Sequence, residues 1–120
     1  MLIRSPWIDL ILKGQKTWEL RGRRTSVRGT IVLIRAGSGQ ISGSCQLVGV
    51  TGPLGLADIK MNVDKHRIPP EDISRFSYGK IFAWELSNAN TFRSPIPYKH
   101  PRGAVVWVRL PDLILRQNHA

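Results

Sequence analysis

The chain has 120 residues, of which 42% are hydrophobic, and four of them are tryptophans. This supplies one domain with one core, and a single cysteine excludes a fold held together by internal disulfides. Eighteen Lys and Arg against eight Asp and Glu give a formal net charge of +10, which favours a polyanionic partner such as nucleic acid over a merely basic protein with scattered charges.

The sequence predicts a cytoplasmic protein without a membrane partner. No signal-type apolar stretch follows Met1, and no apolar run approaches the roughly 20 residues that cross a bilayer. Cys45 has no second cysteine to pair with, which agrees with a reducing compartment. The sequence leaves the oligomeric state open.

The first predicted element is a short helix. Ser5 suits its N-cap, Pro6 suits the first helical position, and Gly14 suits the left-handed position after its end. A strand is expected over residues 17–21, where polar and apolar side chains alternate.

Further strands are expected over residues 30–35 and 40–50, joined by a glycine-containing turn. The apolar run within the first of these predicts burial on both faces. The segment 51–78 carries several Gly and Pro residues and predicts one or two short helices, the better one opening at Pro70.

Strands are expected to resume over residues 81–87, around Phe92, and over residues 105–110. Many short strands separated by turn residues favour a barrel over a parallel sheet.

The segment from Ser5 to Arg21 resembles the opening of ASCH domains, which combine a helix, the pattern Gly-x-Lys-x-x-Glu-x-Arg and a strand. The four matching residues are Gly14, Lys16, Glu19 and Arg21. The placement of this short pattern after a capped helix makes it more specific than the pattern alone.

The resemblance covers most of residues 2–110. It implies an α+β protein, a PUA-like β-barrel with flanking short helices. We therefore expect residues 1–120 to form a single ASCH domain, with a core of about residues 2–110 and a short C-terminal tail over residues 111–120.

The resemblance also implies a cleft near the Lys, the Glu and the Arg, and a role in RNA metabolism. Some ASCH relatives bind nucleic acid, some cleave RNA, and some hydrolyse the amide of an acetylated cytidine. In the amidohydrolases the nucleophile is a threonine at the position of Glu19, so that mechanism does not carry over to this chain.

Lys16 and Glu19 are the candidate catalytic pair if the protein is an enzyme. Lys16 would clamp a phosphate or donate a proton, and Glu19 would act as a general base or accept a hydrogen bond from a base edge. Their spacing of three puts them on opposite faces of a regular strand, so they meet only if the backbone bends or the lysine curls over an edge. The structural alternative is an ion pair between Glu19 and Arg21, which share a face.

The arginines near the motif are the candidate nucleic-acid-binding residues: Arg21, Arg23, Arg24 and Arg28. The last three lie between Gly22 and Gly29, which predicts a loop that carries charge to a phosphate backbone. A merely solvated loop is the alternative.

Aromatic side chains are assigned mainly to the core. Trp7 is either a core anchor or a ring on which a base stacks, and the core is the better interpretation. Trp18, Trp84 and Trp107 lie in apolar strand patterns and are assigned to the core as well.

Other polar groups carry weaker hypotheses. Ser42, Ser44 and Cys45 would supply a nucleophile only with a neighbouring base, so hairpin structure explains them better. A second set would line the same opening as Lys16 if the barrel closes: Tyr78, Lys99, His100 and Arg102. His66, His100 and Cys45 form no metal-ligand spacing, so we expect neither a metal nor a cofactor.

Three functions follow. The first is an RNA- or nucleotide-binding module that uses the cleft and the arginine loop. The second is a small ribonuclease or modified-nucleoside hydrolase in the same cleft, and the third is a protein-binding adaptor whose charge is incidental.

Overall fold

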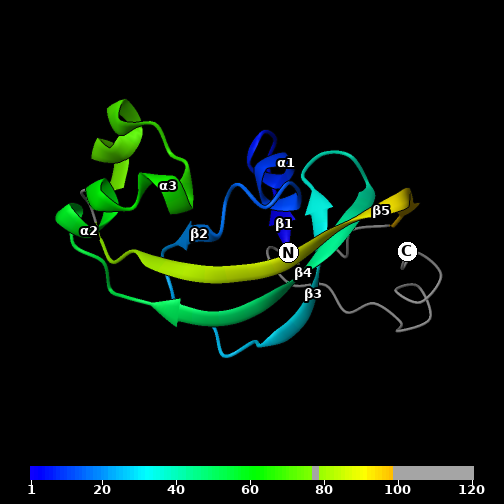
Figure 1. Cartoon of the computed structure of the whole chain (residues 1–120), viewed down its shortest axis with the longest axis horizontal. Helices are drawn as coiled ribbons and strands as arrows, with labels where there is room; N and C mark the ends of the chain where they lie inside the picture. Colours follow the sequence, from blue (N-terminus) through cyan, green and yellow to red (C-terminus); the bar gives the residue numbers. More distant parts are fainter. Residues whose placement is uncertain (77–78, 99–120) are drawn as a thin grey trace.

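The computed structural model describes residues 1–76 and 79–98 (Figure 1). In chain order its elements are β1 (Leu2–Ile3), α1 (Trp7–Leu12), β2 (Trp18–Arg21), β3 (Gly29–Arg35), β4 (Gln40–Thr51), α2 (Leu56–Met61), α3 (Val63–His66), the 3-10 helix η1 (Pro70–Phe76) and β5 (Phe82–Pro97). Several sequence predictions lie outside the described residues: the strand over residues 105–110 with Trp107, the tail, and Tyr78, Lys99, His100 and Arg102.

The five strands form one mixed sheet in the order β1-β3-β4-β5-β2. β1 runs parallel to β3, and the other neighbours are antiparallel. β1 and β2 are the two edge strands, and within residues 1–76 and 79–98 they are not paired with each other. The α+β class is therefore confirmed as a mixed sheet with short helices, while closure into a barrel stays a prediction.

Helix α1 begins at Trp7, one residue later than predicted. Pro6, rather than Ser5, occupies the N-cap position, and the helix ends after Leu12. Gly14 has a φ of +75°, the left-handed conformation that glycine adopts without a steric penalty, as expected. The chain therefore turns sharply between α1 and β2.

Strand β5 is longer than the sequence suggested, because it joins the strand expected over residues 81–87 to the one around Phe92. Its pairing with β4 continues through three register shifts. At one of them Gly43 lies so close to its neighbours that an added Cβ would be 2.6 Å from the Leu12 Cδ2 atom and would overlap the Asn90 carbonyl oxygen. Only glycine fits where α1, β4 and β5 meet.

The described residues form three buried hydrophobic clusters: a main one beneath α1, one of Val32, Ile34, Ile41 and Phe92, and one of Ile59, Ile68 and Ile73 in the helical segment. All four residues of the run 31–34 are buried, as predicted, and Trp84 is the largest fully buried side chain among the described residues. We call residues 56–76, which carry α2, α3 and η1, the helical cap.

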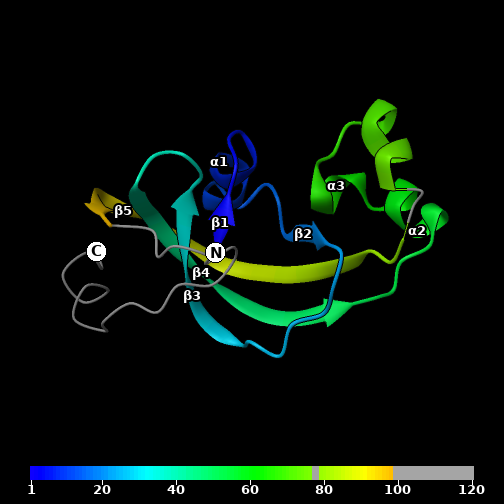
Figure 2. The same ribbon diagram turned by 180° about the vertical axis from the view of Figure 1, so that it is seen from behind.

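Both ribbon views place α1 over the sheet beside β1, with the helical cap at one end of the sheet beyond β2 (Figures 1 and 2). β2 thus lies between the two helical parts. In the part of the chain that the structure describes, no helix is long and apolar enough to span a membrane.

Candidate functional site

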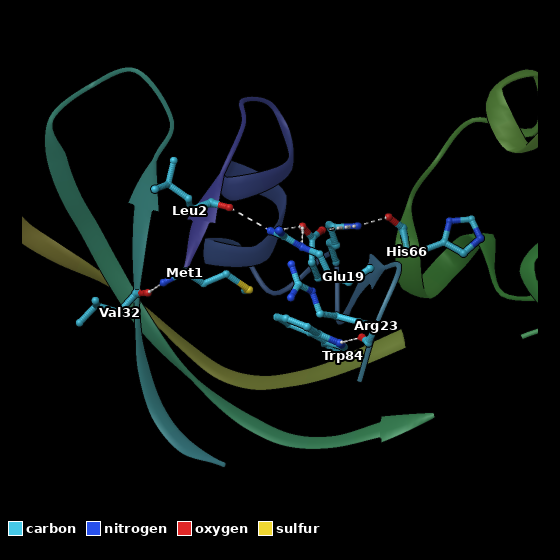
Figure 3. A network of polar contacts seen from close by, with 9 residues as sticks. Met1, Leu2, Glu19, Arg23, Val32, His66 and Trp84 are labelled. Atoms are coloured by element: carbon cyan, nitrogen blue, oxygen red, sulfur yellow. Dashed lines mark hydrogen bonds and ion pairs between the residues drawn. The ribbon is translucent and has the colours of Figure 1, made fainter. Parts of the chain in front are cut away.

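A continuous chain of polar contacts runs from β1 to α3 and crosses the motif residues (Figure 3). The Lys16 ammonium donates to the His66 carbonyl oxygen at 2.6 Å, and its Nζ lies 3.5 Å from Oε1 of Glu19. The other Glu19 oxygen, Oε2, accepts from Arg21 Nε at 3.1 Å and lies 2.9 Å from Nη2. Arg21 Nη2 also donates to the Leu2 carbonyl oxygen at 2.9 Å. We call these five residues the polar chain.

Lys16 and Glu19 meet, which the sequence allowed only if the backbone bends or the lysine curls over an edge. β2 begins only at Trp18, so Lys16 belongs to the turn that leads out of α1 and does not follow the alternation of the strand. The Thr17 amide donates to the Lys65 carbonyl oxygen at 2.9 Å, which draws this turn toward α3. The Glu19–Arg21 ion pair, expected from their shared face, is also present.

The head of Lys16 is inside the protein. The residue is 2% exposed, and its Nζ lies 5.2 Å from the centre of the Trp7 ring. Burial lowers the pKa of Lys16, and the nearby Glu19 carboxylate partly opposes this effect. In this geometry Lys16 supports Glu19 from within, whereas a phosphate clamp requires an accessible ammonium group.

Glu19 and Arg21 border an open pocket of about 290 Å³. Its lining residues are Leu2, Ile3, Arg4, Trp7, Glu19, Leu20 and Arg21. Both edge strands therefore contribute to one hollow, and the Arg21–Leu2 hydrogen bond joins two of its lining residues. The side chains of Glu19 and Arg21 keep 13% and 24% of their surface exposed, so they, unlike Lys16, are the charged motif groups that a ligand can reach.

Trp7 links this pocket to the core. It is half-buried and packs against both the main core cluster and the cluster of the helical cap. Trp7 also lines the pocket. It is therefore a core residue and, at the same time, a ring that a base in the pocket could contact. Trp18 and Trp84 are buried, as the sequence predicts.

The arginine loop follows β2 directly and lies outside the pocket lining. Arg23, Arg24 and Arg28 are all exposed. Arg24 donates to the Gly52 carbonyl oxygen at 2.5 Å, and Arg28 donates to two carbonyl oxygens of its own loop. A guanidinium group has five N–H donors, so these contacts orient the side chains and leave donors for a ligand.

The remaining candidates are structural. His66 is fully buried: its Nε2 is 2.6 Å from the Ile59 carbonyl oxygen, and its Nδ1 accepts from the Ile68 amide. Ser42, Ser44 and Cys45 are buried in β4, and burial raises the pKa of the Cys45 thiol to about 12, which suppresses its nucleophilic form. Among residues 1–76 and 79–98, no three His, Cys, Asp or Glu side chains gather in a way that could hold a metal ion.

The sequence analysis missed Arg4. This exposed residue lines the pocket on the β1 side, opposite the motif residues of β2. No spacing rule connects it with the motif, because it precedes the helix and comes near β2 only when the sheet curves. Its position follows from the tertiary fold alone.

The chain belongs to the ASCH domain family, whose model matches residues 1–96. This confirms the resemblance found in the motif, and ASCH domains are generally associated with RNA binding. No curated protein matches the chain.

Solved structures of an ASCH protein from Zymomonas mobilis share the fold. A tyrosine-to-phenylalanine variant gives a TM-score of 0.78 at 14% identity, covering 99% of this chain and 96% of the other. A serine-to-alanine variant gives 0.76 at 16% identity, with 99% and 94% covered. A further structure, of the ASCH protein itself, gives 0.72 at 16% identity, with 91% and 85% covered. At this identity the likeness establishes the fold alone.

Proposed function

We propose that this ASCH domain binds single-stranded RNA, with one nucleotide in the pocket between β1 and β2 and the phosphate backbone on the arginine loop. The observation that carries the proposal is the meeting of a carboxylate, a guanidinium group and an indole ring in one open pocket. These groups suit the three parts of a nucleotide: the hydrogen-bonding edge of the base, the phosphate and the flat face of the base.

Each group of the pocket has a distinct use. Glu19 accepts hydrogen bonds from the edge of a base, and Arg21 donates to base or phosphate oxygens. The Trp7 indole ring supplies an apolar surface on which a base stacks. Stacking lowers the free-energy cost of moving the base out of water. The polar chain holds both charged groups in place before a ligand arrives, which lowers the entropy lost on binding.

Phosphate binding is assigned to the exposed arginines. The net charge of +10 attracts a polyanion over the whole surface, and Arg23, Arg24 and Arg28 concentrate three cations in the six residues that follow Gly22. Their contacts with backbone carbonyls hold two of the guanidinium groups at the loop surface. Arg4 adds a cation at the rim of the pocket.

Replacing Arg23, Arg24 and Arg28 together by Ala tests this assignment. Each phosphate contact adds about 0.7 to the slope of log affinity against log salt for a single strand, so loss of three contacts flattens the slope by about 2. The measurement is fluorescence anisotropy of a labelled single-stranded RNA over a salt series.

The matched control replaces Lys13, Lys60 and Arg93 by Ala, because these three exposed cations lie on other elements and their loss lowers the net charge equally. We expect the control to keep the parent slope. Equal slopes in the two triple variants would mean that the arginine loop has no special part in binding.

A second candidate function uses the same pocket for catalysis. A lysine with a lowered pKa beside a carboxylate is a pair suited to proton transfer, as in cleavage of RNA or hydrolysis of a modified nucleoside. In that case Glu19, which faces the pocket, is the general base, and Lys16 is its partner from within.

A further inference from the structure

In the polar chain the two carboxylate oxygens of Glu19 have different partners (Figure 3). Oε2 accepts the Nε–H of Arg21 at 3.1 Å and lies 2.9 Å from Nη2. Oε1 lies 3.5 Å from Lys16 Nζ. An ionised carboxylate has about four lone-pair sites, so Glu19, whose side chain is 13% exposed and lines the pocket, keeps acceptor capacity for a ligand.

The carboxylate also has little freedom to turn. Arg21 is itself anchored to the Leu2 carbonyl oxygen, and Lys16 is anchored to the His66 carbonyl oxygen. Rotating Glu19 would break its contact with one cation or the other. The pocket therefore presents a negative hydrogen-bond acceptor at a fixed place between β1 and β2.

We propose that this pocket selects a nucleobase that carries an exocyclic amino group, which donates to the Glu19 carboxylate, and rejects a base with a carbonyl oxygen at that position. The inference rests on the proposed RNA binding and adds the chemistry of the preferred base to it. An amino group donates an N–H to the carboxylate, whereas a carbonyl oxygen facing the carboxylate brings two acceptors together with no hydrogen between them.

Two pairs of bases separate the amino group from other differences in size and shape. Cytosine and uracil differ at position 4, and adenine and hypoxanthine differ at position 6, in each case by an amino group against a carbonyl oxygen. One hydrogen bond to a charged group changes affinity by about tenfold to a hundredfold. We expect the parent protein to prefer cytosine over uracil and adenine over hypoxanthine by a factor in this range.

The test measures anisotropy with four labelled tetranucleotides, each built from one of these bases, for the parent, Glu19→Gln and Glu85→Gln. In the Glu19→Gln variant the negative charge is lost and one carboxylate oxygen becomes an NH₂ group, which donates instead of accepting. The ratio of affinities for cytosine over uracil RNA, and that for adenine over hypoxanthine RNA, should then each fall at least tenfold. Glu85 is the control because it pairs opposite Trp18, which puts it on the other face of the sheet, where it accepts from Thr51.

The possible results separate the two proposals. Preference in the parent and in Glu85→Gln, lost in Glu19→Gln, supports the inference. Binding of all four RNAs with equal affinity, or a preference that survives in Glu19→Gln, overturns the inference and leaves RNA binding intact. Failure to bind any of the four RNAs at low salt overturns the proposed function itself.

Discussion

Replacing Lys16 by Met is expected to lower the free energy of unfolding by about 3 kcal/mol, at the low end of the range for breaking a buried ion pair. Met keeps most of the buried aliphatic stem. It removes the donor to the His66 carbonyl oxygen and the cation beside Glu19. The cost stays at the low end because Arg21 still pairs with Glu19. A thermal melt followed by circular dichroism should show a midpoint lower by roughly 10 °C.

Lys13→Met is the matched control, because Lys13 is exposed and lies three residues before Lys16, at the C-cap position of α1. Its unfolding free energy should stay within about 0.5 kcal/mol of the parent. A double-mutant cycle of Lys16→Met and Glu19→Gln should give a coupling of about 1 kcal/mol or more. A Lys16→Met variant that melts together with the Lys13→Met control would mean that the buried contacts of Lys16 contribute nothing to stability.

If the domain is an enzyme, Glu19→Gln should lower its turnover by about 10² or more. Its affinity for RNA should change no more than the loss of the preference for amino-bearing bases requires. The amide keeps the shape of the side chain and its contact with Arg21, but it accepts no proton. The assay is a time course on labelled single-stranded RNA and on acetylated cytidine, with and without divalent metal.

Glu85→Gln, purified in the same way, controls for contaminating nuclease and for the general loss of one carboxylate. Lys16→Ala tests the partner of Glu19, and its turnover must be compared at a temperature where that variant is folded. Activity that persists unchanged in Glu19→Gln and Lys16→Ala would assign the turnover to another site or to a contaminant.

The local parts of the fold were predictable from the sequence because local rules decide them. Gly14 ends α1 through a backbone conformation that glycine adopts readily, and the apolar run from Ile31 to Ile34 is buried on both faces. The single strand β5 was not foreseen, because its polar stretch around Asn88 interrupts the alternation while pairing with β4 continues.

The motif residues could be found in the sequence, but their arrangement could not. Alternation separates Lys16 from Glu19 only in a regular strand, and Lys16 lies in the turn before β2, which begins at Trp18. The contacts of the polar chain with the Leu2 and His66 carbonyl oxygens are long-range. Such contacts depend on how the sheet curves and on where the helical cap packs, and no local pattern encodes either.

The central claim is that RNA occupies the pocket between β1 and β2. It is tested most directly by titrating ¹⁵N-labelled protein with a short single-stranded RNA and following the amide and indole signals by NMR. We expect the largest shifts at the amides of residues 2–4 and 19–21 and at the Trp7 indole, with smaller shifts along residues 23–28. Largest shifts along α2 and residues 48–51, with the pocket signals unmoved at saturation, would contradict this claim.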